Sequence, residues 1–379
     1  MVPNGWSLVK LGDVLTLGSG DTKPTDLQKE FSDDSPFPVY GGNNIMGYSS
    51  QKNSSDSVIL IGRVGEYCGV TRYIDKACWI TDNALYTKSV SSDIDKEYLV
   101  SKLKKFDLSR LRNKGGQPLV SQKPIYAVKL PMPPLPEQRK IAQILSTWDR
   151  GIATTEKLIE TSKQQKKALM QQLLTGKKRL RSSPKDGAET GKAFEGEWEE
   201  VKLKSCVQFL NGQRKPIKQE ERANIQGSYP YYGATGIIDY VNDYIFDDEI
   251  ILLGEDGENI LSRVLPHVFV VRGKVWVNNH AHVLKANKNA DTDFLCMYLE
   301  SLDYRKYNSG SAQPKINKAV CEKIPVRLPT LIEQQKIASV LTTADKEIEV
   351  LETKLTHFKQ EKKALMQQLL TGKRRVHVE

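Results

Sequence analysis

The sequence predicts an α+β protein in which two tandem units of mixed strands and helices are each followed by a long helix. The main observation is an internal repeat: the twelve residues Lys166–Lys177 return unchanged at Lys362–Lys373, 196 residues later. The stretch ahead of them, Leu135–Asp149, returns as the similar Leu331–Asp345 at the same offset. A period of about half the chain predicts two copies of one architecture. Because the copies differ most outside these helices, we expect them to perform one task on two different targets.

The looser parts of the repeat give the domain boundaries. WSLVKL from Trp6 matches WEEVKL from Trp198, and YGGNNIMGY from Tyr40 matches YGATGIIDY from Tyr232. A polar, charged segment with proline and glycine separates the halves and is typical of a linker. The predicted segments are a first unit (1–134), a first helix (135–176), a linker (177–196), a second unit (197–330), a second helix (331–373) and a C-terminal tail (374–379).

The composition excludes several classes of protein. The 379 residues carry a net charge of +10, which suggests a polyanionic partner, although a generically basic protein is an alternative. The five cysteines are scattered without a CxxC pair, which argues against a disulfide framework or a zinc ribbon. Neither a signal region after Met1 nor an apolar run of membrane-spanning length occurs in the sequence, so we expect a cytoplasmic protein.

Each long helix carries one apolar stripe whose members are alternately four and three residues apart. This is the heptad spacing of a left-handed coiled coil. The pattern predicts helices at about 137–175 and 333–371, each ended by a left-handed glycine, Gly176 or Gly372. The predicted helix-pairing residues are Ile141, Leu145, Trp148, Ile152, Ile159, Leu169 and Leu173 in the first copy and Ile337, Leu341, Ile348, Leu351, Leu355, Phe358, Leu365 and Leu369 in the second.

We expect the two stripes to be buried against each other. Trp148 occupies the slot of Ala344, and Ser162 occupies that of Phe358, so large residues in one copy correspond to small ones in the other, as in a mixed pair. The first helix leads away from the first unit and the second helix leads back. An antiparallel coiled coil with pseudo-twofold symmetry therefore needs only short connections. Two independent surface helices are the alternative.

The two units are predicted to be small sheets with one or two packed helices. Val58–Gly62 and Ile250–Gly254 are short β-rich runs that end in glycine. Further strands are expected at Cys78–Ile80, Val268–Val271 and Val275–Val277, and helices at Leu99–Arg112 and Phe294–Tyr307.

The tandem arrangement resembles the specificity (S) subunit of type I restriction–modification enzymes. The resemblance rests on the motif PPLxEQxKIAxxL…ALMQQLLTGK, which occurs twice and covers, with the units ahead of it, essentially the whole chain. Thr330–Leu331–Ile332 departs from the pattern at Pro134–Leu135–Pro136. The family's motif residues correspond to Pro134, Leu135, Glu137, Gln138, Ile141 and Ala142 in the first copy and to Leu331, Glu333, Gln334, Ile337 and Ala338 in the second.

The resemblance implies a non-catalytic DNA reader with two α/β target-recognition domains. Each domain would read one half of a split, asymmetric site on double-stranded DNA. The helices would set the gap and dock two adenine-N6 methyltransferase (M) subunits, to which endonuclease/translocase (R) subunits add. The chain itself would need no cofactor, whereas the partner methyltransferase would use S-adenosylmethionine.

The length of the helices limits the gap. About 39 residues at 1.5 Å per residue give a rod of roughly 58 Å. B-form DNA advances about 3.4 Å per base pair, so readers at the two ends address at most about 17 base pairs. Half-site centres about 34 Å apart would place both readers on one face of the duplex.

Candidate DNA contacts precede a Gln-Pro pair in each unit, on a predicted helix and the loop after it. Their basic side chains suit phosphate contacts, with a solvated helix face as the alternative. Gln117 and Gln313 suit an adenine edge or, equally, a turn-stabilising role. The basic candidates are Lys104, Lys105, Arg110, Arg112 and Lys114 in the first unit and Arg305, Lys306, Lys315 and Lys318 in the second.

A second group of candidates lies beside predicted strands. Arg63 follows a strand and lies between two glycines, where it suits a guanine edge. Its counterpart Glu255 suits the amino group of cytosine. Lower-grade candidates of the same kind are Asn43, Asn44, Asn278, Asn279 and His280.

No catalytic residue is predicted. The chain has neither an NPPY-type methyltransferase motif nor a glycine-rich cofactor motif, and Gly187–Ala193 lacks the Walker spacing. His280 and His282 alternate along a possible strand without companion ligands, so no metal site is expected.

Two alternatives to a specificity subunit remain: an autonomous bipartite DNA-binding regulator, and an enzyme with an unrecognised nuclease site. A self-sufficient regulator would have helices that are polar outside the paired stripe. Six apolar residues instead lie off the stripe, where they suit partner docking: Ile144, Leu158, Leu174, Val340, Val350 and Leu370.

Overall fold

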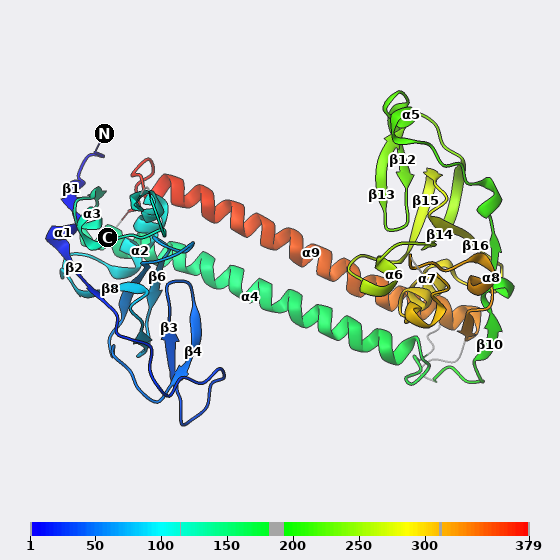
Figure 1. Ribbon diagram of the computed structural model, residues 1–379, viewed down its shortest axis with the longest axis horizontal. Coiled ribbons are helices and arrows are strands. Elements are labelled where there is room, and N and C mark those ends of the chain that lie inside the picture. Colours follow the sequence, from blue (N-terminus) through cyan, green and yellow to red (C-terminus); the bar gives the residue numbers. More distant parts are fainter. Residues whose placement is uncertain (1, 114, 182–192, 311–312, 378–379) are drawn as a thin grey trace. The chain divides into compact units, whose positions relative to one another are not determined.

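The computed structural model describes residues 2–113, 115–181, 193–310 and 313–377. The chain divides into unit 1, which comprises Met1–Lys157 and Glu352–Glu379, and unit 2, which comprises Leu158–Leu351. Each unit contains one sheet domain and a part of both long helices (Figure 1). This division differs from the six expected segments because the start of each long helix packs in one unit and its end packs in the other.

Unit 1 contains a four-stranded antiparallel sheet with the order β2-β8-β5-β6. The predicted strand Val58–Gly62 is β5, and all five of its residues are buried. A hairpin of β3 and β4 extends from this region and pairs in parallel with β7 (Figure 1), whereas β1 pairs with β9. The other strands are β1 (Ser7–Lys10), β2 (Leu15–Ser19), β3 (Phe37–Tyr40), β4 (Ile45–Ser49), β6 (Thr71–Ile74), β7 (Trp79–Ile80), β8 (Ala84–Val90) and β9 (Lys129–Met132).

Unit 2 repeats this topology in one sheet of order β11-β16-β14-β15-β12-β13. The strands predicted at 268–271 and 275–277 are a single strand, β15, whose end pairs in parallel with β12. The β12–β13 hairpin forms one edge of this sheet. The strands are β10 (Glu199–Lys202), β11 (Val207–Phe209), β12 (Gln226–Tyr232), β13 (Ile237–Val241), β14 (Phe246–Gly254), β15 (Val268–Val277), β16 (Ala281–Ala286) and β17 (Pro325–Leu328).

The helix predicted ahead of each Gln-Pro pair is broken in two. In unit 1, α2 (Lys96–Phe106) ends at Asp107, whose φ of 64° is left-handed, and a short 3-10 helix follows. In unit 2, α7 (Thr292–Glu300) is likewise separated from a 3-10 turn. The 3-10 helices are Leu108–Leu111, Leu203–Ser205, Asn211–Gln213 and Tyr304–Tyr307, and the short α-helices are α1 (Leu11–Val14), α3 (Gln122–Tyr126), α5 (Gln219–Ala223), α6 (Asn259–Ser262) and α8 (Lys318–Cys321).

The long helices are α4 (Leu135–Leu173) and α9 (Leu331–Leu369), each 39 residues long. Both begin and end two residues earlier than predicted. A proline is tolerated in the first helical turn, so Pro136 does not delay the start of α4. At the other end, Gly176 is left-handed with φ 71°, and Lys178 N–H donates to the Gln172 carbonyl at 3.1 Å, which closes the helix before the glycine.

The two long helices pair antiparallel in each unit. In unit 1, Lys362 Nζ lies 2.5 Å from Asp149 Oδ1, and Trp148 packs edge-on against Phe358 with ring centroids 5.5 Å apart. In unit 2, Lys166 Nζ lies 2.5 Å from Asp345 Oδ1. Each pair joins equivalent residues with the roles of the helices exchanged, as the pseudo-twofold relation predicts. None of the fifteen predicted stripe residues is exposed, so the coiled-coil prediction is confirmed.

The core of each unit includes residues from both long helices. In unit 1, Ile141 and Leu145 of α4 and Leu369 and Leu370 of α9 belong to one buried cluster with α2 and the sheet. In unit 2, the equivalent cluster contains Leu173 and Leu174 of α4 with Ile337 and Leu341 of α9. Each sheet domain is thereby fastened to the start of one helix and to the end of the other. No described helix is long and apolar enough to cross a lipid bilayer.

Candidate nucleic-acid interface

Three loops of unit 1 meet at the end of β5. Arg63 N–H donates to the Asn83 carbonyl at 2.9 Å, and Val120 N–H donates to the Arg63 carbonyl at 2.9 Å. Gly65 N–H donates to the Pro118 carbonyl at 2.8 Å. A Cβ on Gly62 would lie 2.6 Å from the Gly42 carbonyl oxygen, so the backbone of the 41–44 loop approaches the same place. The structure thus brings together Arg63, the Asn43–Asn44 loop and the Gln117–Pro118 loop. We call this the unit 1 loop cluster.

Unit 2 has an equivalent cluster at the end of β14. Glu255 N–H donates to the His280 carbonyl at 2.8 Å, and Ile316 N–H donates to the Glu255 carbonyl at 2.8 Å. Gly257 N–H donates to the Pro314 carbonyl at 3.0 Å. These are the same contacts as in unit 1. The unit 2 loop cluster therefore contains the loops of Glu255, Asn278–His280 and Gln313–Pro314.

The two clusters differ in charge at their equivalent central residue. Arg63 Nη1 donates to Ser19 Oγ at 3.0 Å. Glu255 lies 2.8 Å from Arg214 Nη1 and 3.3 Å from Lys315 Nζ. Burial by itself would raise the pKa of Glu255, but Arg214, His282 and Lys315 together lower it below its usual value. Glu255 is therefore an anion whose oxygens already accept from two cations.

The histidines of unit 2 are held by hydrogen bonds. His282 is fully buried, with Nε2 2.8 Å from the Ile316 carbonyl and Nδ1 2.9 Å from Asn211 Nδ2. This arrangement requires the neutral tautomer in which Nε2 donates and Nδ1 accepts. The exposed His280 lies 2.9 Å from Asp256 Oδ1. Within the described ranges, no group of three or more histidine, cysteine or carboxylate side chains is placed to hold a metal ion.

The candidate amides differ in accessibility. Asn278 is only 5 % exposed and accepts from His280 N–H, whereas Asn44 and Asn279 are exposed. Asn43 Oδ1 accepts from Arg72 Nη2 at 3.0 Å. Gln117 and Gln313 are both exposed at the edge of their clusters. Arg72 was not identified from the sequence because an insertion after Gly257 obscures its alignment with unit 2.

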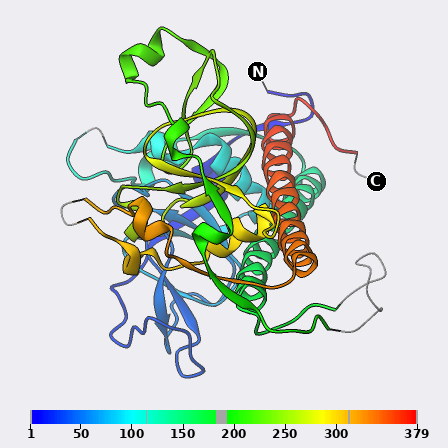
Figure 2. The same ribbon diagram turned by 90° about the vertical axis from the view of Figure 1, so that its right-hand side faces the viewer.

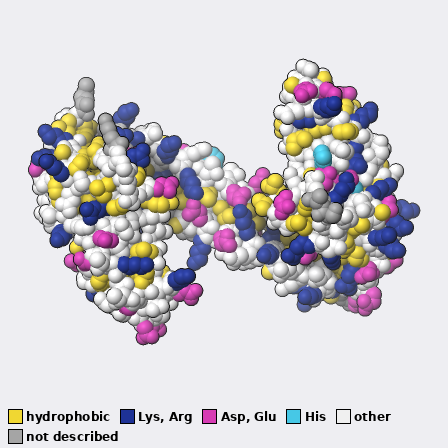
Figure 3. All heavy atoms as spheres, viewed as in Figure 1, with side chains coloured by type: hydrophobic (Ala, Val, Ile, Leu, Met, Phe, Trp, Pro, Cys, Tyr) yellow, Lys and Arg dark blue, Asp and Glu magenta, His cyan; other side chains and the backbone are white. Residues whose placement is uncertain are grey.

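The basic candidates that the structure describes have different surroundings, and Lys315 is the one that contacts the central residue of a loop cluster, Glu255. Lys104 instead lines a cavity of about 460 Å³ between α2 and α4, together with Asp149 and Arg150. Burial, reinforced by Lys362, lowers the pKa of Lys104. On the face shown in Figure 3, basic side chains are mixed with acidic ones. Four of the other basic candidates are exposed: Lys105, Arg110, Arg112 and Lys318. Three have a partner within their own unit, since Arg305 pairs with Asp303, Lys306 lies over Tyr307 and Lys315 pairs with Glu255. Lys114 lies outside the described residues.

The docking candidates fall into three groups. Leu174 and Leu370 are 2 % and 1 % exposed and belong to the unit cores, so the surface position predicted for them is wrong. They lie past the last stripe residue, where each helix end packs on a sheet domain. Ile144 and Val340 are half-buried against the same cores. Leu158 and Val350 are 48 % and 66 % exposed and remain available to a partner.

The glutamine of each helix motif ties its helix to its own sheet domain. Gln138 Oε1 accepts from Asp95 N–H at 2.9 Å, and its Nε2 donates to the Pro133 carbonyl at 2.9 Å. Gln334 makes the equivalent bonds to Asp291 at 2.8 Å and to Pro329 at 2.9 Å. The repeated glutamine thus fixes the direction in which each long helix leaves its domain.

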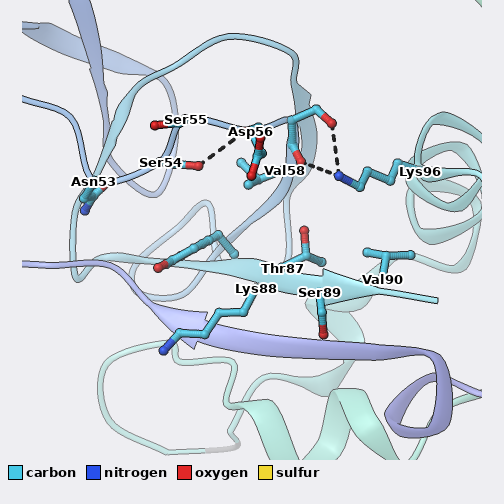
Figure 4. A pocket seen from close by; sticks show the side chains of 12 residues that line it. Asn53, Ser54, Ser55, Asp56, Val58, Thr87, Lys88, Ser89, Val90 and Lys96 are labelled. Carbon is cyan, nitrogen blue, oxygen red and sulfur yellow. Dashed lines mark hydrogen bonds between the residues drawn. The ribbon is translucent and has the colours of Figure 1, made fainter. Parts of the chain in front are cut away.

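A polar cavity of about 520 Å³ lies at the other end of β5, away from the unit 1 loop cluster (Figure 4). Hydroxyl groups and two lysines line it. Lys96 Nζ donates to the carbonyl and to Oγ of Ser57 at 2.6 and 3.0 Å. Val58, the first residue of β5, lines this cavity, whereas Gly62 at the end of β5 adjoins the loops. The cavity and the cluster are therefore separate features.

The architecture is that of a duplicated recognition protein with two loop clusters carried by paired helices. The family model described as "Type I restriction modification DNA specificity domain" matches residues 3–164 and 195–360. The chain therefore belongs to the type I restriction–modification specificity family.

Individual relatives agree with this assignment. The chain is 27 % identical over 412 aligned positions to the type I restriction enzyme MjaVIII specificity subunit of Methanocaldococcus jannaschii. The alignment covers 99 % of this chain and 94 % of that protein. It is 35 % identical over 147 residues to a putative type I specificity subunit of Haemophilus influenzae, covering 39 % and 37 % of the two chains.

A solved structure shares the fold. The crystal structure of a type I restriction–modification S subunit from M. genitalium superimposes with a TM-score of 0.70 at 17 % identity, over 97 % of this chain and 99 % of that chain. The two chains therefore share a fold of two sheet domains and two long helices.

Proposed function

We propose that the chain is the non-catalytic reader of a type I restriction–modification complex, in which each loop cluster reads one half of a split, asymmetric DNA site. The observation that carries this proposal is the pair of equivalent clusters with different side chains at the same place, Arg63 in one and Glu255 with its two cations in the other. Identical loop frameworks with different chemistry suit two different half-sites.

The long helices would set the gap between the half-sites. Gln138 and Gln334 fix each helix to a sheet domain, and the helix pair is antiparallel in each unit. A rod held in this way would fix the separation of the two readers. Its length of 39 residues corresponds to roughly 58 Å.

The helix surface would dock two adenine-N6 methyltransferase subunits, and through them the endonuclease subunits. The exposed Leu158 and Val350 support this role, because large apolar side chains on an otherwise polar helix suit a protein partner. The methyltransferase subunits would bring S-adenosylmethionine, and the chain itself would act without a cofactor.

The test is to co-express the chain with the adjacent methyltransferase of its host and to map N6-methyladenine by single-molecule sequencing. We expect one split motif that disappears when the chain is omitted. Methylation that is unchanged without the chain would overturn the proposal. In that case, tight sequence-specific binding by the purified chain alone would identify an autonomous regulator.

A further inference from the structure

Arg72 of β6 is an arginine without an acidic partner. Its Nη2 donates to Asn43 Oδ1 at 3.0 Å, and its Nη1 is buried with no hydrogen-bond partner in the part of the chain that the structure describes. Among the described residues, no carboxylate forms an ion pair with it. Burial lowers its pKa, which reflects the unfavourable position of the charge. A buried donor without a partner reduces stability, so Arg72 is not explained by the fold.

The repeat provides an internal comparison for this position. Arg72 lies opposite Leu60 in the β5–β6 pair, and Phe269 lies opposite Leu252 in the equivalent β14–β15 pair. Phe269 packs on Tyr232 with ring centroids 5.8 Å apart. In unit 2, the position equivalent to Arg72 is therefore occupied by an aromatic residue that packs on a tyrosine.

The partner of Arg72 differs between the units as well. Asn43 corresponds to Thr235, because YGGN from Tyr40 aligns with YGAT from Tyr232. Both members of the Arg72–Asn43 pair are thus absent from unit 2. Arg72 and Asn43 contact each other and are both replaced in unit 2, so the pair is a feature specific to unit 1.

The hydrogen bond also decides what Asn43 can offer to a ligand. Arginine only donates, so the amide atom facing Arg72 is Oδ1, and the Asn43 amino group points the other way. That amino group has no partner within the part of the chain that the structure describes. An asparagine that reads adenine turns both its oxygen and its amino group toward the base, whereas here the oxygen faces Arg72. Asn43 is therefore presented as a donor.

We propose that Arg72 is a positioning residue that fixes Asn43 as a hydrogen-bond donor toward an acceptor on the DNA of the first half-site. The inference rests on the proposed function, since it assumes that the unit 1 loop cluster faces DNA. The acceptors on DNA that share this chemistry are O6 and N7 of guanine, N7 of adenine and O4 of thymine in the major groove, and the backbone phosphates. Neither thymine methyl groups nor amino groups of bases fit a donor of this kind.

The experiment uses the full chain co-expressed with its methyltransferase, and it compares Arg72→Phe and Asn43→Ala with the unaltered protein. Arg72→Phe places in unit 1 the residue type that unit 2 already accommodates, so the fold has a precedent for it. Lys76→Met, which removes an exposed charge just after β6, is the control for charge alone. The measurements are the N6-methyladenine motif and the salt dependence of DNA binding by the complex.

For a contact to a base edge, we expect both variants to relax the same single base of the first half-site by about tenfold or more, with the second half-site unchanged. For a phosphate contact, we expect both variants to bind all sequences more weakly, with the motif unchanged, and we expect the salt slope of Asn43→Ala to stay the same because the amide carries no charge. A motif and a DNA affinity that both match those of the unaltered protein, in variants with unchanged thermal unfolding, would overturn the inference. A missing split motif with the unaltered chain would instead overturn the proposed function.

Asn43→Asp gives a second, independent readout. An aspartate still faces Arg72 but presents only acceptors to DNA. We expect the first half-site to lose its preference for an acceptor at the affected base, and to gain one for a base with an amino group if the contact is to a base edge. The same base preference as in the unaltered protein, together with an unchanged salt slope, would show that Asn43 does not face DNA.

Discussion

Arg179 and Glu333 form a two-point ion pair in unit 2, with Nε 2.6 Å from Oε1 and Nη2 2.7 Å from Oε2. Arg375 and Glu137 form the same pair in unit 1, with both distances 2.7 Å. In both units, the arginine follows the glycine that ends one long helix, and the glutamate lies in the first turn of the other. Each pair thus joins the end of one helix to the start of its partner. Arg375 also donates to the Asn4 carbonyl, and Figure 2 shows the blue N-terminal segment near the red end of α9.

We predict that Arg179→Ala destabilises the protein by about 3–5 kcal/mol. Glu333 is fully buried, so removal of its partner leaves an uncompensated charge in the interior. Arg305→Ala is the matched control, because Arg305 pairs with Asp303 at the surface, where solvent screens the pair and its loss changes stability little. Urea unfolding measures both values. Similar losses for the two variants would contradict the structural role of the buried pair.

The two helix-ending glycines should differ in their response to alanine. Both have a left-handed backbone, with φ of 71° at Gly176 and 70° at Gly372, and alanine costs about 1 kcal/mol in such a conformation. A Cβ on Gly372 would also lie 2.5 Å from Pro3 Cγ, whereas one on Gly176 would lie 3.3 Å from Trp198. We therefore expect a larger fall in Tm for Gly372→Ala. Equal falls in Tm for the two variants would show that the N-terminal segment at Pro3 moves away from the new Cβ without a loss of stability.

The buried His267 predicts a pH-dependent stability. Burial lowers its pKa to about 4, and both ring nitrogens lack a hydrogen-bond partner among the described residues. The unfolded chain therefore binds a proton near pH 6.5 that the folded chain does not bind until about pH 4. Stability falls as the pH drops through this window, by about 3 kcal/mol in total from this group.

His267→Phe tests this contribution. The ring of His267 packs at a tilt against Tyr304 with centroids 4.6 Å apart, a contact that phenylalanine can keep. We expect the difference in unfolding free energy between pH 7 and pH 4.5 to be smaller in the variant than in the unaltered protein. His280→Phe is the control, because His280 is exposed. An undiminished pH dependence in His267→Phe would place the titrating group elsewhere.

The proposed ruler predicts the effect of lengthening both helices together. One heptad inserted after Lys157 in α4 and one after Leu351 in α9 would lengthen the pair by about 10 Å, or about 3 base pairs of DNA. The methylated motif should keep both half-site sequences and gain about 3 base pairs in its gap. Insertion into α4 alone is the control, and it should abolish methylation because the stripes no longer match. A changed half-site sequence in the double insertion would contradict the separation of reading and spacing.

The long helices were predictable because a heptad stripe repeated over 39 residues has one structural solution. Their chain direction also followed from connectivity. The ring contact of Trp148 with Phe358 could not be predicted in this way. The repeat showed only that the equivalent position in the other copy holds a small residue in each case. Antiparallel pairing places the large residues of both copies at the same level, and only the register of the folded pair reveals this.

The candidate sites, too, were predictable from the sequence only in part. The sequence placed Arg63 and Glu255 after strands and beside glycines, and the structure brings each of them to a cluster with the Gln-Pro loop. It gave no indication that Glu255 pairs with Arg214, which lies 41 positions earlier. It also grouped Lys104 with the loop residues, although Lys104 lines the cavity between α2 and α4.

The sequence by itself determined the duplication, the helix pair and the family, because these depend on patterns that recur along the chain. Only the tertiary structure decided which side chains meet. Arg72 faces Asn43, Arg179 faces Glu333, and Leu174 is buried in a core, and each of these contacts joins segments that no local period relates. The physical reason is that hydrogen bonds, ion pairs and burial depend on distances of a few ångströms, which are set when the sheets and helices pack.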